Sequence, residues 1–133
     1  MPHLVNDEEL LAAAKAARAS AYAPYSKFAV GAALLTAEGE VFTGCNVENL
    51  SFGLTVCAER NAVFAAVNAG RRSFLRIAVC ADSKEPVAPC GACRQVLAEF
   101  APDVEVISIT LTGDEYRARM SELLPRSRAG ILG

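Results

Sequence analysis

The arrangement of apolar and polar positions along the chain predicts a protein that contains both strands and helices. Apolar runs of strand length, or short alternations of apolar and charged residues, predict five β-strands. The strands are expected at residues 28–36, 40–45, 74–81, 104–111 and 116–120. Stretches rich in alanine and other helix-forming residues predict three α-helices and one further helical turn. The helices are expected at residues 7–21, 57–69 and 91–100, and the turn at 121–124.

Capping and turn residues mark the ends of these elements. Asn6 precedes three acidic residues and can cap the first helix, whose N-terminal end favours negative charge. Pro24 ends that helix, and a Glu-Gly pair at 38–39 supplies a turn between the first two strands. Gly70 follows the second helix at the position where glycine commonly ends helices. The stretch 46–55 is rich in Asn, Ser and Gly and is expected to be a loop.

The lengths of the connections predict how the strands pair. Strands 74–81 and 104–111 are joined through a helix, so we expect them to be parallel, with a right-handed crossover. Strands 104–111 and 116–120 are separated by four residues, and so short a link permits only an antiparallel pair. We therefore expect one α/β domain over residues 1–133, with a mixed five-stranded sheet and helices packed on it.

The composition adds expectations about assembly and partners. Hydrophobic residues make up 53% of the chain and charged residues only 21%, and the mean hydropathy is +0.27. Because no apolar run reaches the roughly 18 residues that span a bilayer, we expect no membrane partner and a homo-oligomer that buries the excess apolar surface. The net charge of −2 and the pI of about 5.4 argue against nucleic acid as the main ligand, since that would require a basic face.

The numbers of cysteines and histidines limit which metal ligands and catalytic bases the chain can supply. The chain begins with acidic residues where a secretory leader has basic and apolar ones, so we expect a cytoplasmic protein. Five cysteines in a reducing compartment indicate metal binding or catalysis rather than disulfides. The single histidine, His3, lies close to the N-terminus. Any metal site must therefore be built from cysteines and carboxylates, and a mechanism that needs a buried histidine base is nearly excluded.

Three of the cysteines begin predicted helices. Cys57 starts the second helix, and Cys90 and Cys93 are three residues apart at the start of the third, so they share one helical face and can reach one ion. A helix N-terminus favours the thiolate, which is the form that binds zinc. Three thiolates leave one tetrahedral position open, as in catalytic zinc sites, and Glu59 lies two residues beyond the first ligand. The alternative is that the three are buried thiols packed as small hydrophobes.

The remaining two cysteines are interpreted differently. Cys45 and Cys80 lie on predicted strands without partner motifs, and we expect them to be core thiols.

Two motifs and their surroundings connect the chain to a known family. The motifs are C-A-E-R at 57–60 and P-C-G-A-C-R-Q at 89–95, accompanied by N-V-E-N at 46–49. With P-Y-S at 24–26 and E-L-L-P at 122–125, they make nearly the whole chain resemble the homotetrameric zinc-dependent cytidine deaminases. The resemblance implies a three-layer α/β/α fold of the cytidine deaminase type, with helices on both faces of the sheet, and a homotetramer.

The resemblance also implies an activity and a cofactor. The reaction would be the hydrolytic deamination of free cytidine and deoxycytidine to uridine and deoxyuridine plus ammonia, a step of pyrimidine salvage. One Zn²⁺ per subunit would be held by Cys57, Cys90 and Cys93. Glu59 would be the catalytic proton shuttle, and Arg60 would hydrogen bond to the thiolates and offset their charge.

Substrate contacts follow from the same resemblance. Phe28 would stack on or edge the pyrimidine, Asn46 and Glu48 would bind the ribose 3′-hydroxyl, and the backbone near Ala58 would hydrogen bond to the base. For these residues the alternatives are a core aromatic at Phe28 and turn residues at Asn46 and Glu48. Arg60 could be an ordinary helix-surface arginine.

Some positions depart from the family pattern or have no assigned role. Relatives often have a tyrosine where this chain has Phe52, and an aromatic residue near the C-terminus, which 126–133 lacks. Arg94 and Gln95 belong to the second motif, and we interpret them as structural.

Other functions compete with this one. They are deamination of another aminopyrimidine nucleoside such as a nucleoside antibiotic, deamination of polynucleotides, and a non-catalytic zinc-binding interaction module. The polynucleotide enzyme would need a basic groove, and the interaction module would need a fourth protein ligand.

Overall fold

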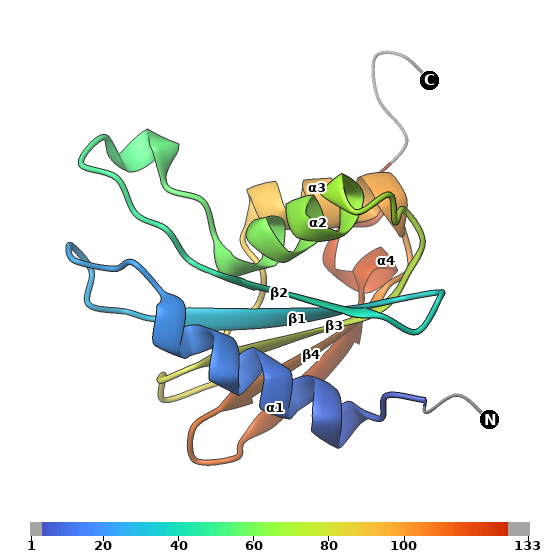
Figure 1. Cartoon of the computed structure of the whole chain (residues 1–133), viewed down its shortest axis with the longest axis horizontal. Coiled ribbons are helices and arrows are strands. Elements are labelled where there is room, and N and C mark those ends of the chain that lie inside the picture. Colours follow the sequence, from blue (N-terminus) through green and yellow to red (C-terminus); the bar gives the residue numbers. More distant parts are fainter. Residues whose placement is uncertain (1–3, 128–133) are drawn as a thin grey trace.

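The structure is a computed structural model that describes residues 4–127 (Figure 1). Five strands form the sheet: β1 (Val30–Thr36), β2 (Val41–Cys45), β3 (Phe74–Ala81), β4 (Glu105–Thr110) and β5 (Glu115–Arg119). The α-helices are α1 (Asp7–Ala17), α2 (Ala58–Asn68), α3 (Gly91–Phe100) and α4 (Met120–Leu123), and two 3-10 turns lie at Arg18–Ser20 and Phe52–Leu54. No described helix is long and apolar enough to cross a membrane.

The strands lie in the order β2-β1-β3-β4-β5. β1 is antiparallel to both β2 and β3, β3 and β4 are parallel, and β5 returns antiparallel to β4. The predicted parallel and antiparallel pairs are confirmed. They follow from connection length, because a helix joins β3 to β4 and a tight turn joins β4 to β5.

Helices cover both faces of the sheet, as the fold-class prediction requires. α1 lies across one face, and α2, α3 and α4 lie on the other (Figure 1). Successive residues of β1 point to opposite faces, so Ala32 and Leu34 pack under α2 and α3 while Ala33 and Leu35 pack under α1. Cys80 is buried on the α1 side, which confirms the core-thiol prediction, whereas Cys45 is only half-buried at the end of β2.

Two glycines let helices lie directly on the sheet. A Cβ atom at Gly44 in β2 would be 2.4 Å from the Ala62 nitrogen and 2.5 Å from the Ala58 carbonyl oxygen in α2. A Cβ atom at Gly31 in β1 would be 2.0 Å from the Ala14 carbonyl oxygen in α1. Any larger residue at Gly44 would push the start of α2 off the strand.

One boundary differs from the prediction in a way that matters for the site. The first strand begins at Val30 rather than at residue 28. Lys27 has a φ of 61°, and the Phe28 carbonyl accepts a hydrogen bond from the Asn46 side chain instead of a neighbouring strand. Phe28 therefore belongs to the loop before β1, where 36% of its surface is exposed.

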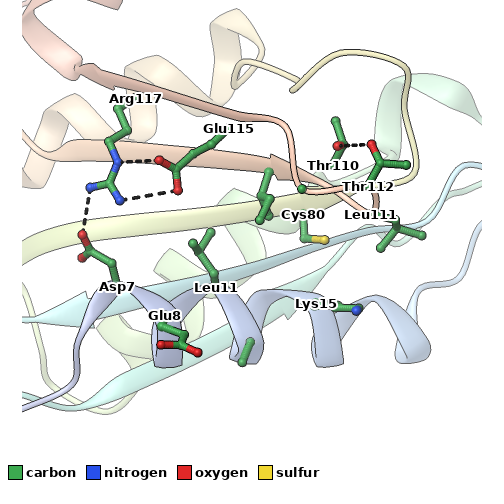
Figure 2. A pocket seen from close by; sticks show the side chains of 13 residues that line it. Asp7, Glu8, Leu11, Lys15, Cys80, Thr110, Leu111, Thr112, Glu115 and Arg117 are labelled. Atoms are coloured by element: carbon green, nitrogen blue, oxygen red, sulfur yellow. Dashed lines mark hydrogen bonds and ion pairs between the residues drawn. The ribbon is translucent and has the colours of Figure 1, made fainter.

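A cleft of about 510 Å³ lies between α1 and the β4–β5 hairpin, and Figure 2 shows its lining. Arg117 Nη1 lies 2.8 Å from Asp7 Oδ2 and its Nε lies 2.9 Å from Glu115 Oε2, so these charges pair with one another and tie α1 to β5. Leu11 and Cys80 line the apolar part. The Cys57, Cys90 and Cys93 cluster lies outside this cleft, at the starts of α2 and α3.

Candidate active site

The three sulfurs predicted to bind metal lie together where α2 and α3 begin. Cys57 and Cys90 are the N-cap residues of these helices, and Cys93 lies in the first turn of α3. The sulfur of Cys90 is 3.7 Å from that of Cys57 and 3.4 Å from that of Cys93, and all three lie within 4.8 Å of one another. Tetrahedral Zn–S bonds of about 2.3 Å place sulfurs roughly 3.8 Å apart, so the cluster fits a zinc ion.

The surroundings of Cys57 favour the charged form of its sulfur. A hydrogen bond from the Cys93 thiol and another from the Arg60 guanidinium, whose Nη2 is 3.5 Å from Cys57 Sγ, lower the pKa of Cys57 to about 5. The same hydrogen bond raises the pKa of Cys93. A positive group beside a thiolate stabilises the form that binds metal.

Glu59 is a buried carboxyl group one residue beyond Ala58 at the start of α2. Only 5% of its surface is exposed, and burial raises its pKa to about 7. A carboxyl group whose pKa lies near the working pH can both accept and donate a proton. The buried position and the adjacent sulfur cluster are what a proton shuttle requires.

A cleft of about 320 Å³ opens over this cluster. Its lining includes each residue for which a substrate contact was expected, together with Glu59 and two of the cysteines. The lining residues are Ser26, Phe28, Val30, Asn46, Glu48, Thr55, Cys57, Ala58, Glu59, Val87, Ala88 and Cys90. Cys93 is buried and does not line the cleft.

Asn46 joins the loop before β1 to the end of β2. Its Oδ1 accepts a hydrogen bond from the Val30 nitrogen at 2.8 Å, and its Nδ2 donates one to the Phe28 carbonyl at 2.8 Å. Only 8% of the residue is exposed. An amide nitrogen carries two hydrogens, so these bonds use one of them, and Asn46 also lines the cleft. Asn46 thus holds Phe28 at the mouth of the cleft, a role that the sequence analysis did not include.

Glu48 organises the neighbouring loop. Its Oε1 accepts hydrogen bonds from the Tyr25 and Ser26 nitrogens at 3.0 and 3.1 Å, and its Oε2 accepts one from the Ser26 hydroxyl. These bonds, the one from the Ser26 hydroxyl above all, lower the pKa of Glu48. Ser26 Oγ also accepts a hydrogen bond from the Phe28 nitrogen at 3.0 Å, so a single network positions Glu48 and Phe28.

Three residues at the site were missed or left without a role by the sequence analysis. Ser26 lies within the P-Y-S motif, but its bonds to Glu48 depend on a contact between distant segments. Asn61 donates a hydrogen bond to the Cys45 carbonyl at 2.8 Å and so ties α2 to the end of β2. Arg94 bonds to two backbone carbonyls. Residue type alone gave no signal for these partners.

The departures from the family pattern lie beside the cleft or outside the described residues. Phe52 is 73% exposed, and its ring meets that of Tyr25 edge-on at 5.9 Å. Both line a hollow of about 360 Å³ that shares Ser26, Glu48 and Thr55 with the cleft. His3 and the C-terminal residues 128–133 lie outside the described residues.

Comparisons with known proteins agree with this arrangement. Residues 4–109 match the family model described as the cytidine and deoxycytidylate deaminase zinc-binding region. A cytidine deaminase from Halalkalibacterium halodurans is 57% identical over 82% of this chain and 83% of its own length. One from Sporosarcina psychrophila is 52% identical over 89% of this chain and 88% of its own. The crystal structure of cytidine deaminase from Burkholderia pseudomallei superposes with a TM-score of 0.89 at 52% identity, covering 92% of this chain and 98% of that one.

Proposed function

The chain belongs to the zinc-dependent cytidine deaminase family, and on that premise we propose that it hydrolyses free cytidine and deoxycytidine to uridine and deoxyuridine with release of ammonia. One observation carries the proposal most directly. The buried carboxyl group of Glu59 and a three-sulfur cluster that fits zinc adjoin one cleft of about 320 Å³. We infer that residues 1–133 form a single catalytic domain.

The chemistry divides between the metal and Glu59. Zinc, when bound by Cys57, Cys90 and Cys93, supplies the Lewis acidity that makes a water molecule nucleophilic near neutral pH. The Glu59 carboxylate accepts a proton from the attacking water and delivers it to N3 of the pyrimidine, while the oxygen adds to C4. Glu59 then takes the proton from the new hydroxyl group on C4 and passes it to the amino group, so that the C4 carbonyl forms as the C4–N bond breaks. One water is consumed, and one ammonia is released.

Arg60 compensates the charge of the sulfurs in this proposal. Three thiolates and Zn²⁺ carry a net charge of about −1, which weakens the Lewis acidity of the metal. The Arg60 guanidinium donates a hydrogen bond to Cys57 Sγ at 3.5 Å, and this contact withdraws negative charge from the ligand.

The residues around the cleft favour a free nucleoside. Phe28 offers an aromatic surface to the pyrimidine, and the backbone near Ala58, where α2 begins, can donate a hydrogen bond to the base. Asn46 and Glu48 border the same cleft and suit the ribose 3′-hydroxyl. In a polynucleotide that oxygen carries phosphate, which the ionised Glu48 would repel.

The substrate proposal is tested by ammonia release from purified protein. Cytidine and deoxycytidine should both be deaminated, whereas cytidine 3′-monophosphate should be a poor substrate because of the carboxylate at Glu48. An aminopyrimidine nucleoside antibiotic serves as the comparison for the rival substrate class. If the antibiotic has the higher kcat/KM, that rival is correct. If no nucleoside is deaminated by zinc-loaded protein, the catalytic proposal is wrong.

We also propose that the protein is a homotetramer, a cytoplasmic enzyme of pyrimidine salvage. Apolar side chains gather on the loop 46–56 beside the cleft, where Leu50, Phe52 and Leu54 are 78%, 73% and 65% exposed. Patches of this kind mark protein interfaces. A reducing compartment such as the cytoplasm would also keep the metal-binding thiols free.

Light scattering at micromolar concentration should give about four times the chain mass of 14.0 kDa. Placing aspartates at Leu50 and Phe52 together should lower that mass, because charge on the patch opposes its burial. A wild-type particle of 14.0 kDa at every concentration tested would refute the assembly.

A further inference from the structure

We propose that Arg94 is a positioning residue that holds the Cys90 end of the zinc site in place, with the end of α4 as its second anchor. The inference rests on the proposed role of Cys57, Cys90 and Cys93 as the zinc ligands. Arg94 belongs to the P-C-G-A-C-R-Q motif but takes no part in the proposed chemistry of deamination, and the inference gives it a positioning role at the zinc site.

The segment that carries Cys90 has few attachments of its own. Cys90 follows the loop that leaves β3, and its side chain does not cap α3. In the part of the chain that the structure describes, two hydrogen bonds involve residues 83–89. One runs from the Ser83 hydroxyl to the Glu85 carbonyl, and the other from Arg94 to the Pro89 carbonyl. The peptide group just before Cys90 is therefore held by Arg94.

That peptide group controls where the Cys90 sulfur lies. Pro89 is fully buried, and a buried carbonyl oxygen needs a hydrogen-bond donor. Arg94 Nε supplies it at 2.8 Å. Because the Pro89–Cys90 peptide plane contains the Cα atom of Cys90, fixing its carbonyl restricts where that Cα lies and therefore the region that the sulfur can reach. Arg94 directly follows Cys93. The helical turn that carries Cys93 therefore also holds the segment that carries Cys90.

The second arm of the guanidinium reaches a distant element. Arg94 Nη1 donates a hydrogen bond to the Leu123 carbonyl at 3.0 Å. Leu123 ends α4, and carbonyls at the end of a helix have no partner within the helix. Both acceptors are backbone carbonyls rather than carboxylates, so Arg94 acts here as a two-armed hydrogen-bond donor. A lysine, with one ammonium group, cannot reproduce the planar fork.

The consequence is specific to one ligand. Cys93 is buried in α3 and Cys57 begins α2, so both keep their positions when the Arg94 contacts are lost. Cys90 is exposed and would move with its loop. Partners that orient metal ligands typically contribute about 10- to 100-fold to metal affinity, and we expect a loss in that range without Arg94.

The test compares zinc release from purified zinc-loaded proteins to a coloured chelator. Arg94→Met keeps the apolar stem, removes both donors and should release zinc faster, with affinity lowered about 10- to 100-fold. Arg94→Lys should be intermediate, because its ammonium can still reach one carbonyl. Arg71→Met is the matched control, because Arg71 pairs with Glu40 beyond the far end of α2 and its loss leaves both the Cys90 loop and α4 untouched. Its zinc affinity should equal that of the wild type.

The outcomes separate this inference from the proposed function. Wild-type affinity in Arg94→Met, or an equal loss in Arg71→Met, overturns the inference and leaves the zinc site standing. A wild-type protein that retains no zinc overturns both. If Arg94→Met does not fold, Arg94→Lys carries the comparison, and wild-type affinity in that variant overturns the inference. Melting of the metal-free proteins completes the test, because a merely structural arginine would lower the melting temperature without changing zinc affinity.

Discussion

The Glu59→Gln protein is expected to fold and to retain zinc while losing nearly all turnover. Glutamine has the size of glutamate, but its amide cannot accept a proton from water. General acid–base catalysis contributes typically about 10²- to 10⁴-fold, so kcat should fall at least that far. Stability should not suffer, because burial already disfavours the charged form of this side chain, whose pKa is raised to about 7.

The measurement pairs kcat for cytidine with zinc content by elemental analysis on the same sample. Glu85→Gln is the matched control, because Glu85 is an exposed glutamate on the loop before Cys90. The control should keep wild-type turnover. Activity within tenfold of wild type in a zinc-replete Glu59→Gln protein would remove Glu59 from the role of proton shuttle.

The second large effect is expected for Cys90→Ala, which should lose both bound zinc and activity. Removing one of three sulfurs leaves two protein ligands, and zinc in proteins is held by three or four. Zinc content after gel filtration, measured beside cytidine turnover, reports both losses. The wild type should carry about one zinc per chain.

The chain provides its own controls for this prediction. Cys80 is buried under α1, and Cys45 lies half-buried at the end of β2. Cys80→Ala and Cys45→Ala should retain wild-type zinc content, because neither residue belongs to the cluster of sulfurs that lie within 4.8 Å of one another. Zinc loss in either control would show that the wrong cysteines had been assigned to the metal site.

The elements best predicted from sequence are those with local causes. β3 at residues 74–81 and α3 at residues 91–100 have the expected bounds, because a polar loop precedes α3 and a proline follows it closely. The first strand was expected to begin two residues early, since its apolar run continues through Phe28. The strand begins later because the side chain of Asn46, which directly follows β2, donates a hydrogen bond to the Phe28 carbonyl.

The same difference between local causes and contacts of distant segments is found at the site. The cysteine spacing and Glu59 were visible because ligand geometry on a helix is a local property. The side chains that hold the site in place could not be predicted. Asn61 reaches the Cys45 carbonyl, and Arg94 reaches the Leu123 carbonyl, only after distant segments of the chain meet. The groups that carry the proposed chemistry can thus be predicted from the sequence, whereas the side chains that position them cannot.

The close contact at Gly44 has a consequence for motion. Where β2 and α2 meet at this point, backbone lies on backbone, and no side chain stands between them that could change rotamer and let the helix slide. α2 and its Glu59 are therefore fixed to the sheet. The loop around Phe52 is attached less firmly, since isolated bridges from Val47 to Tyr22 and to Val56 flank it and Phe52 itself is 73% exposed. Any adjustment to nucleosides with different sugars should therefore occur in the loop around Phe52, while the groups that move protons stay still.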